Sequence, residues 1–158
     1  MRRFALLCCV AAFVGCAKSD NQPADTTPAV ATPPVPPAPK PIVLADVAGK
    51  WNVKGMNEAG DSTLVTYVFT ATPDTAGWSI KFANVAKPVR VHVVSVAGDS
   101  IVIAAGPYPS VLRKGVQVRT TGALRLQDGK LVGVSTAHYT VKTSDSVRVV
   151  RTEGTRAP

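Results

Sequence analysis

From about residue 42 to its end, the chain alternates between apolar and polar positions in short runs. This alternation has the two-residue period of β-strands, and no run in that region carries a convincing helical period. In GWSIKF at 77–82, for example, Trp78, Ile80 and Phe82 fall on one face and the residues between them fall on the other. The pattern predicts an all-β domain over 42–158.

Eight such runs are separated by short sequences rich in Gly, Asp and Asn, which are typical of tight turns. Eight sequential strands joined mainly by tight turns favour an eight-stranded up-and-down antiparallel barrel, whose closure removes exposed sheet edges. A two-sheet β-sandwich is the alternative. The predicted strands are 49–56, 62–71, 77–82, 89–96, 100–105, 116–127, 130–141 and 146–152.

Successive connections in such a barrel alternate between its two ends. The longer and less regular connections, 83–88 and 106–115, share one end, which predicts an open mouth there, while the N-terminal segment enters at the opposite end. Barrel mouths are common ligand sites. The alternative is a barrel filled by its own large side chains, since eight strands leave little internal room. The residues predicted at the rim, as candidate ligand contacts, are Tyr108, Val111, Leu112 and Arg113.

The N-terminal residues have a different composition. An Arg-Arg pair at 2–3 precedes FALLCCVAAFV at 4–14, which is apolar throughout. This run is too short to cross about 30 Å of hydrocarbon as a helix, but it is typical of a secretory signal, with the arginines as its basic start. Cys8 and Cys9 lie inside it, so removal of the signal would leave Cys16 as the only cysteine.

The sequence FVGC at 13–16 resembles the lipobox of bacterial lipoproteins, with small Gly15 before Cys16 and phenylalanine where that family prefers leucine. The resemblance implies cleavage before Cys16, a diacylglyceryl group on its sulfur and a further acyl chain, such as palmitate, on the new amine. Several acyl chains together anchor a protein stably. Because no aspartate follows the cysteine, the resemblance implies the outer membrane, facing the periplasm. Ordinary signal cleavage after Ala17 is the alternative.

The segment from the cysteine to residue 41 contains eight of the thirteen prolines of the chain. Such sequences favour extended polyproline II structure and act as semi-rigid spacers of about 3.1 Å per residue. We expect a disordered spacer that holds the folded part away from the membrane, and a proline motif for a protein partner is the alternative. The predicted organisation is therefore a signal peptide at 1–15, a lipidated cysteine with a proline-rich linker at 16–41, and a β-barrel domain at 42–158.

The first predicted strand begins with AGKWNV, in which Gly49 and Trp51 resemble the Gly-x-Trp signature of lipocalins and their calycin relatives. The resemblance implies that the tryptophan plugs the closed end of the barrel and that an arginine of the last strand packs over its ring. Such a stack is a favourable cation–π contact. The last predicted strand offers Arg148 and Arg151, and we expect Arg151, which is nearer the strand end. The resemblance also implies a small apolar ligand in the barrel.

The candidate catalytic groups do not form a recognisable site. Six of the eight carboxylates after residue 42 lie in predicted turns, which scatters them and disfavours paired acid–base catalysis. His92 and His138 have no third ligand nearby of the kind a catalytic zinc ion needs. The chain also lacks nucleophile and phosphate-loop motifs. We therefore expect no catalytic residues, no metal site and no cofactor.

The chain has a formal net charge of +8, but its basic residues are dispersed. Nucleic-acid binding needs a dense basic patch or aromatic stacking residues, and export would remove that partner. The charge favours solubility, or attraction to anionic lipid or polysaccharide. Together these features predict a membrane-anchored, non-enzymatic envelope lipoprotein that binds a small hydrophobic or amphipathic ligand. The alternative is an envelope scaffold with a filled barrel, and the oligomeric state is open.

Overall fold

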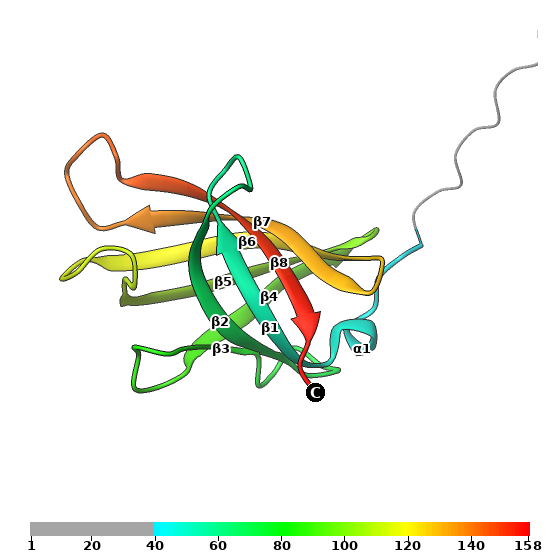
Figure 1. Ribbon diagram of the computed structural model, residues 1–158. Helices are drawn as coiled ribbons and strands as arrows, with labels where there is room; N and C mark the ends of the chain where they lie inside the picture. The colour runs from blue at the N-terminus through cyan, green and yellow to red at the C-terminus, as the bar shows by residue number, and fades with distance from the viewer. Residues whose placement is uncertain (1–39) are drawn as a thin grey trace, which may run out of the picture. The chain divides into compact units, whose positions relative to one another are not determined.

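The computed structural model describes residues 40–158, so the predicted signal, Cys16 and the linker up to residue 39 lie outside the described residues. Within them, eight antiparallel strands close into a barrel in sequence order (Figure 1). This confirms the predicted up-and-down barrel and makes the β-sandwich alternative wrong. The strands are β1 (Gly49–Met56), β2 (Thr63–Ala71), β3 (Ser79–Phe82), β4 (Val89–Ala97), β5 (Ser100–Pro109), β6 (Gln117–Gln127), β7 (Lys130–Tyr139) and β8 (Val147–Arg156).

The barrel closes where β1 pairs with β8 in a continuous register from Trp51 opposite Arg156 to Met56 opposite Arg151. Every strand therefore has two hydrogen-bonded neighbours, as a closed barrel requires. The pairing of β3 with β4 is the shortest in the barrel, because β3 has four residues and only two of them pair with β4.

The core follows from the alternation along each strand. In β1, for example, Trp51, Val53 and Gly55 are buried and the residues between them are exposed. The buried hydrophobic residues form one contiguous cluster inside the barrel. This cluster and all eight strands lie within one compact unit, Pro37–Pro158, which we call the barrel unit. Because this unit holds its whole core, it contains what a domain needs to fold on its own.

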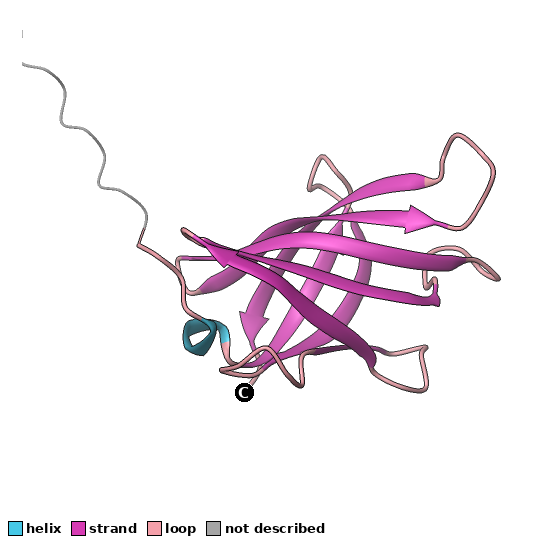
Figure 2. Ribbon diagram, turned by 180° about the vertical axis from the view of Figure 1, so that it is seen from behind, coloured by secondary structure: helices cyan, strands magenta, loops and turns pink. Residues whose placement is uncertain are grey.

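A short helix that the sequence did not predict, α1 (Leu44–Val47), covers one end of the barrel. Its last residue, Val47, is completely buried, and the nearby Ile42 N–H donates a hydrogen bond to the Gly98 carbonyl in the β4–β5 turn. Figure 2 shows α1 at the end opposite the loops that follow β5 and β7. We call the α1 side the closed end and the other side the mouth.

Strand β5 is longer than predicted and extends to Pro109. Glycine and proline usually end strands, so the sequence predicts a loop for GPYP at 106–109. An irregularity in the β5–β6 register takes up the extra residues between Ala105 and Tyr108. Gly106 has φ of 105° and precedes a cis peptide bond to Pro107. A Cβ at Gly106 would lie 2.7 Å from the Val118 carbonyl oxygen, so only glycine fits there.

Candidate functional site

At the closed end, Trp51 is fully buried, and the one hydrogen-bond donor of its side chain has a partner. Its Nε1–H donates a hydrogen bond of 2.8 Å to the Val47 carbonyl of α1. The guanidinium of Arg156 lies over the ring, 4.4 Å from its centroid. Arg156 also donates to the carbonyls of Ala48, at 2.8 Å, and Asp46, at 2.6 Å. One arginine thus fixes the tryptophan and the helix to the last strand.

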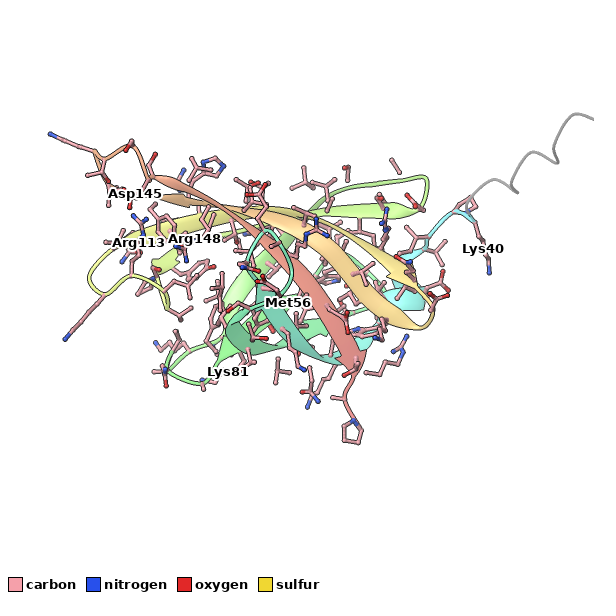
Figure 3. The ribbon with its side chains drawn as sticks, turned by 45° about the horizontal axis from the view of Figure 1, so that its top comes forward. Lys40, Met56, Lys81, Arg113, Asp145 and Arg148 are labelled. Carbon is pink, nitrogen blue, oxygen red and sulfur yellow. The ribbon has the colours of Figure 1, made fainter. Side chains whose placement is uncertain are left out.

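The prediction that Arg151 packs over Trp51 is wrong. The structure places Arg151 opposite Met56, toward the mouth, where its Nε donates to the Glu58 carbonyl at 2.5 Å. The reason is the length of β8, which continues beyond the predicted end at residue 152 and brings Arg156 opposite Trp51. The other predicted alternative, Arg148, is exposed on β8 near the mouth (Figure 3).

Gly49, the other residue of the predicted signature, lies under this arginine. It has φ of 127°, a value that side chains rarely adopt, and a Cβ there would approach the Arg156 Nη1 to 3.0 Å. Glycine therefore gives the chain its sharp entry into β1 and leaves room for Arg156 above Trp51. The two signature residues and Arg156 form a single structural unit.

The mouth half of the barrel contains a cavity that reaches from the barrel centre to the loop after β5. The centre of a water-sized sphere can move in about 80 Å³ of it. The apolar lining residues are Val53, Val65, Phe69, Ile80, Phe82, Ile103, Val111, Leu112, Val118, Leu124, Leu131, Ala137 and Val150, with Gly122. The lining residues with hydroxyl groups are Tyr67, Tyr108, Ser110, Thr120, Ser135, Tyr139 and Thr152.

Large and small side chains face each other across this cavity. On one side the rings of Tyr67 and Phe82 lie 5.3 Å apart between centroids, and Tyr108 stacks on Phe82 at 5.7 Å. On β6, β7 and β8, several lining residues are small and leave space open beside the larger Leu124, Leu131 and Tyr139. These small residues are Gly122, Ser135, Ala137 and Thr152.

All three tyrosines of the chain line the cavity. Burial raises the pKa of Tyr67 to about 12, and Tyr108 adds to this shift. Burial also raises the pKa of Tyr108, while the neighbouring Thr120 hydroxyl opposes that change. Because both pKa values are raised, both phenols are neutral hydrogen-bonding groups at physiological pH. Part of the Tyr67 surface remains accessible, because its ring borders the open space of the cavity.

Thr152 is the one buried polar side chain of the described core, with 4% of its surface exposed. Its hydroxyl lies near that of Tyr67, close enough to oppose part of the rise in the Tyr67 pKa. Even so, Thr152 Oγ1 has no partner with hydrogen-bonding geometry among the described residues. A buried hydroxyl without a partner is uncommon, because such a group loses its bonds to water on folding.

The predicted rim residues lie close together. Val111 and Leu112 line the outer part of the cavity, whereas Tyr108 lies deeper than predicted, inside the barrel on β5. The Arg113 guanidinium lies over the Tyr139 ring, 4.3 Å from its centroid, and forms an ion pair of 2.5 Å with Asp145. This pair joins the loops after β5 and β7 at the mouth, at the opposite end from Lys40 (Figure 3).

The Asp145 side chain is exposed, with 62% of its surface accessible. A hydrogen bond from the Thr143 hydroxyl and the contact with Arg113 lower the pKa of Asp145. Charge at the mouth is thus paired outside the cavity, and no charged side chain among the described residues lines the cavity itself.

The other candidate groups lie elsewhere. His92 and His138 are both exposed, on β4 and β7, and the described residues contain no cluster of three or more side chains suited to a metal ion. Within residues 40–158 no helix is long and apolar enough to span a membrane.

Sequence reasoning missed Arg156 and Thr152, and it predicted Tyr67 only as one of the large side chains that could fill the interior. The alternation of β2 already places Tyr67 on the same face as Phe69, and that of β8 places Thr152 with Gly154. Neither pattern shows that their hydroxyls meet, because that depends on the register of both strands with β1.

No protein-family model, no curated protein and no solved structure matches this chain. The relationship to lipocalins therefore stays a prediction, and the barrel fold stands on the structure alone.

Proposed function

We propose that this chain is a lipid-anchored, non-enzymatic protein of the bacterial cell envelope whose barrel binds a small apolar or amphipathic molecule through its mouth. The anchor is the predicted acylated Cys16, in the outer membrane and facing the periplasm. The cavity in the mouth half is the observation that carries the binding part of this proposal.

Three properties of the cavity support ligand binding. Its accessible space of about 80 Å³ exceeds, several times, the roughly 10–15 Å³ that a single water molecule needs by the same measure. Its walls are mainly apolar with a few hydroxyl groups, as in known small-molecule sites. The loop residues Val111 and Leu112 form its outer part, where side chains can move to admit a ligand.

The position of the N-terminal segment is consistent with a tethered binding protein. Ile42 and Val47 pack at the closed end, so the chain that leads back to Cys16 meets the barrel there. The loops 110–116 and 140–146 lie at the other end. A tether attached at the closed end leaves the mouth free to meet a ligand in the surrounding fluid.

A filled scaffold remains the second candidate, and the aromatic packing favours it. Tyr67, Phe82 and Tyr108 together occupy much of the barrel interior. If these rings move to fill the remaining space in solution, the barrel is a rigid support for contacts with other envelope molecules.

Native mass spectrometry of the barrel unit after gentle purification tests ligand binding. We expect a co-purifying small molecule that is lost in Val111→Trp, which places a large ring in the outer cavity. The matched control is Val134→Trp, because Val134 is 50% exposed on β7 and the same ring there lies outside the barrel. If all three proteins show only their own unliganded masses, and none binds added octan-1-ol, the result would favour the scaffold.

The anchor is tested separately in the full chain. The mass of the intact protein from native membranes should show cleavage before Cys16 and the added mass of acyl chains. Cys16→Ala should abolish both and leave the protein unacylated. An unmodified chain that starts at another residue and is free in the periplasm would contradict the anchor without touching the binding proposal.

A further inference from the structure

We propose that the cavity selects neutral amphiphiles, meaning molecules with an alkyl or ring portion and one uncharged hydroxyl or carbonyl group, over molecules with a carboxylate. This inference rests on the proposed function, because it names the class of ligand that the same cavity takes. The polar end of the ligand bonds to Thr152 and Tyr67, and its apolar part lies along the aromatic side.

The first argument is the unpartnered hydroxyl of Thr152. It is nine-tenths or more buried, it lines the cavity, and it has no hydrogen-bond partner among the described residues. Such a group loses its hydration on folding and regains it only when a ligand or a water molecule supplies a partner. A ligand hydroxyl or carbonyl supplies that bond, whereas a pure hydrocarbon does not.

The second argument is the way in which two distant strands bring their hydroxyls together. Thr152 pairs with Gly55 of β1, and Gly55 also pairs with Val65 of β2, two residues from Tyr67. A Cβ at Gly55 would lie 2.8 Å from the Val65 Cγ1 and 3.1 Å from the Val150 Cγ1. Because this position has no side chain, the side chains of β8 and β2 can extend toward each other across β1, and the hydroxyls of Thr152 and Tyr67 can face one ligand group.

The third argument is the absence of charge. No lysine, arginine or histidine among the described residues lines the cavity. Two arginines toward the mouth are already engaged: Arg113 pairs with Asp145, and Arg151 donates to the Glu58 carbonyl. An ionised carboxylate would lose its hydration in the cavity without gaining a cation, which is unfavourable. The two phenols with raised pKa values stay protonated at neutral pH, so they offer neutral hydrogen bonds and no compensating positive charge.

The test compares matched ligands and matched variants by isothermal titration calorimetry of the barrel unit. The ligands are octan-1-ol, octan-2-one and octanoate, which share chain length and differ in the polar end. We expect octan-1-ol and octan-2-one to bind at least about tenfold more tightly than octanoate at neutral pH. At a pH below the octanoate pKa, octanoic acid should approach the affinity of the alcohol.

Thr152→Val is the central variant, because it keeps the branched shape of the side chain and replaces only the hydroxyl with a methyl group. We expect it to weaken octan-1-ol binding about three- to tenfold, which corresponds to the loss of one hydrogen bond. It should also fold at least as stably as the parent protein, since an unsatisfied buried hydroxyl is gone. Tyr67→Phe should act in the same direction. Thr121→Val, on the exposed outer face of β6, is the control and should change nothing.

The outcomes separate the two proposals. If octanoate binds as well as octan-1-ol, or if Thr152→Val leaves octan-1-ol binding unchanged, the ligand-class inference is overturned while small-molecule binding stands. If none of the three ligands binds the parent protein, both proposals fail and the filled scaffold remains.

Discussion

The two ends of this barrel differ in how tightly their side chains pack and in how completely their polar groups are hydrogen-bonded. At the closed end, Trp51 is fully buried, donates to a backbone carbonyl and lies under Arg156, which itself bonds to two further carbonyls. In the mouth half, a cavity remains and the buried Thr152 hydroxyl has no partner. The same sheet thus builds a sealed end and an open end.

This difference indicates that the closed end mainly stabilises the fold, whereas the mouth half is suited to ligand binding. Fully packed and fully bonded regions contribute most to folding stability, whereas functional regions often keep space and unsatisfied groups that cost stability. Substitutions at the closed end should therefore lower stability without a direct effect on ligand contacts. Substitutions of cavity hydroxyls should change binding and leave stability equal or higher.

The largest effect is expected for Trp51→Ala in the barrel unit. Removing a fully buried ring should lower the free energy of unfolding by about 3–5 kcal/mol, because a cavity replaces it and the contact with Arg156 is lost. Urea denaturation measures this value. Leu112→Ala, in the half-buried loop at the mouth, should cost less than about 1 kcal/mol. Equal costs at the two ends would contradict the stabilising role of the closed end.

A smaller loss of stability is expected for Gly106→Ala in β5. The residue has φ of 105°, and the new Cβ would press against the Val118 carbonyl, so the variant should lose roughly 2–3 kcal/mol. Gly98→Ala is the matched control, since Gly98 has φ of 56° and open space around it, and should lose about 1 kcal/mol. Thermal unfolding of both proteins gives the comparison. If the Gly106→Ala protein is as stable as the Gly98→Ala control, the backbone around Gly106 can accommodate a Cβ without strain, and this prediction is wrong.

Arg156→Ala should lower the free energy of unfolding by about 1–2 kcal/mol, through loss of the cation–π contact and two hydrogen bonds. Arg151→Ala removes the same charge from the same strand and should cost less than about 0.5 kcal/mol. Chemical denaturation at two salt concentrations measures both. A larger loss of stability for Arg151→Ala than for Arg156→Ala would contradict the stabilising role of Arg156 at the closed end.

The smallest effect is a dependence of stability on alkaline pH. The pKa of Tyr67 is about 12 in the folded protein and near 10.0 in the unfolded chain, so the unfolded chain releases its proton first. Stability from this group is complete below pH 10 and declines as the pH rises toward 12. Denaturation at several alkaline pH values should show this decline, and Tyr67→Phe should reduce it. A decline of the same slope in the variant would show that Tyr67 is not the group responsible.

The sequence predicted the barrel well because strand periodicity and turn residues are local signals. Its first strand, 49–56, has the same bounds in the structure. The sequence failed at Arg156 because the end of β8 depends on pairing with β1, which no local pattern shows. For the same reason it could name rim residues such as Leu112 but not the meeting of Tyr67 with Thr152. Helix α1 was missed because four residues are too few to show a helical period.

A crystal structure of the barrel unit grown with octan-1-ol would decide how the mouth half works. We expect the alcohol inside the barrel, its chain along Tyr108 and Phe82 and its hydroxyl within hydrogen-bonding distance of Thr152 Oγ1. A barrel whose interior has closed around its own rings, with the alcohol absent or bound only on the outer face, would contradict ligand binding in this cavity.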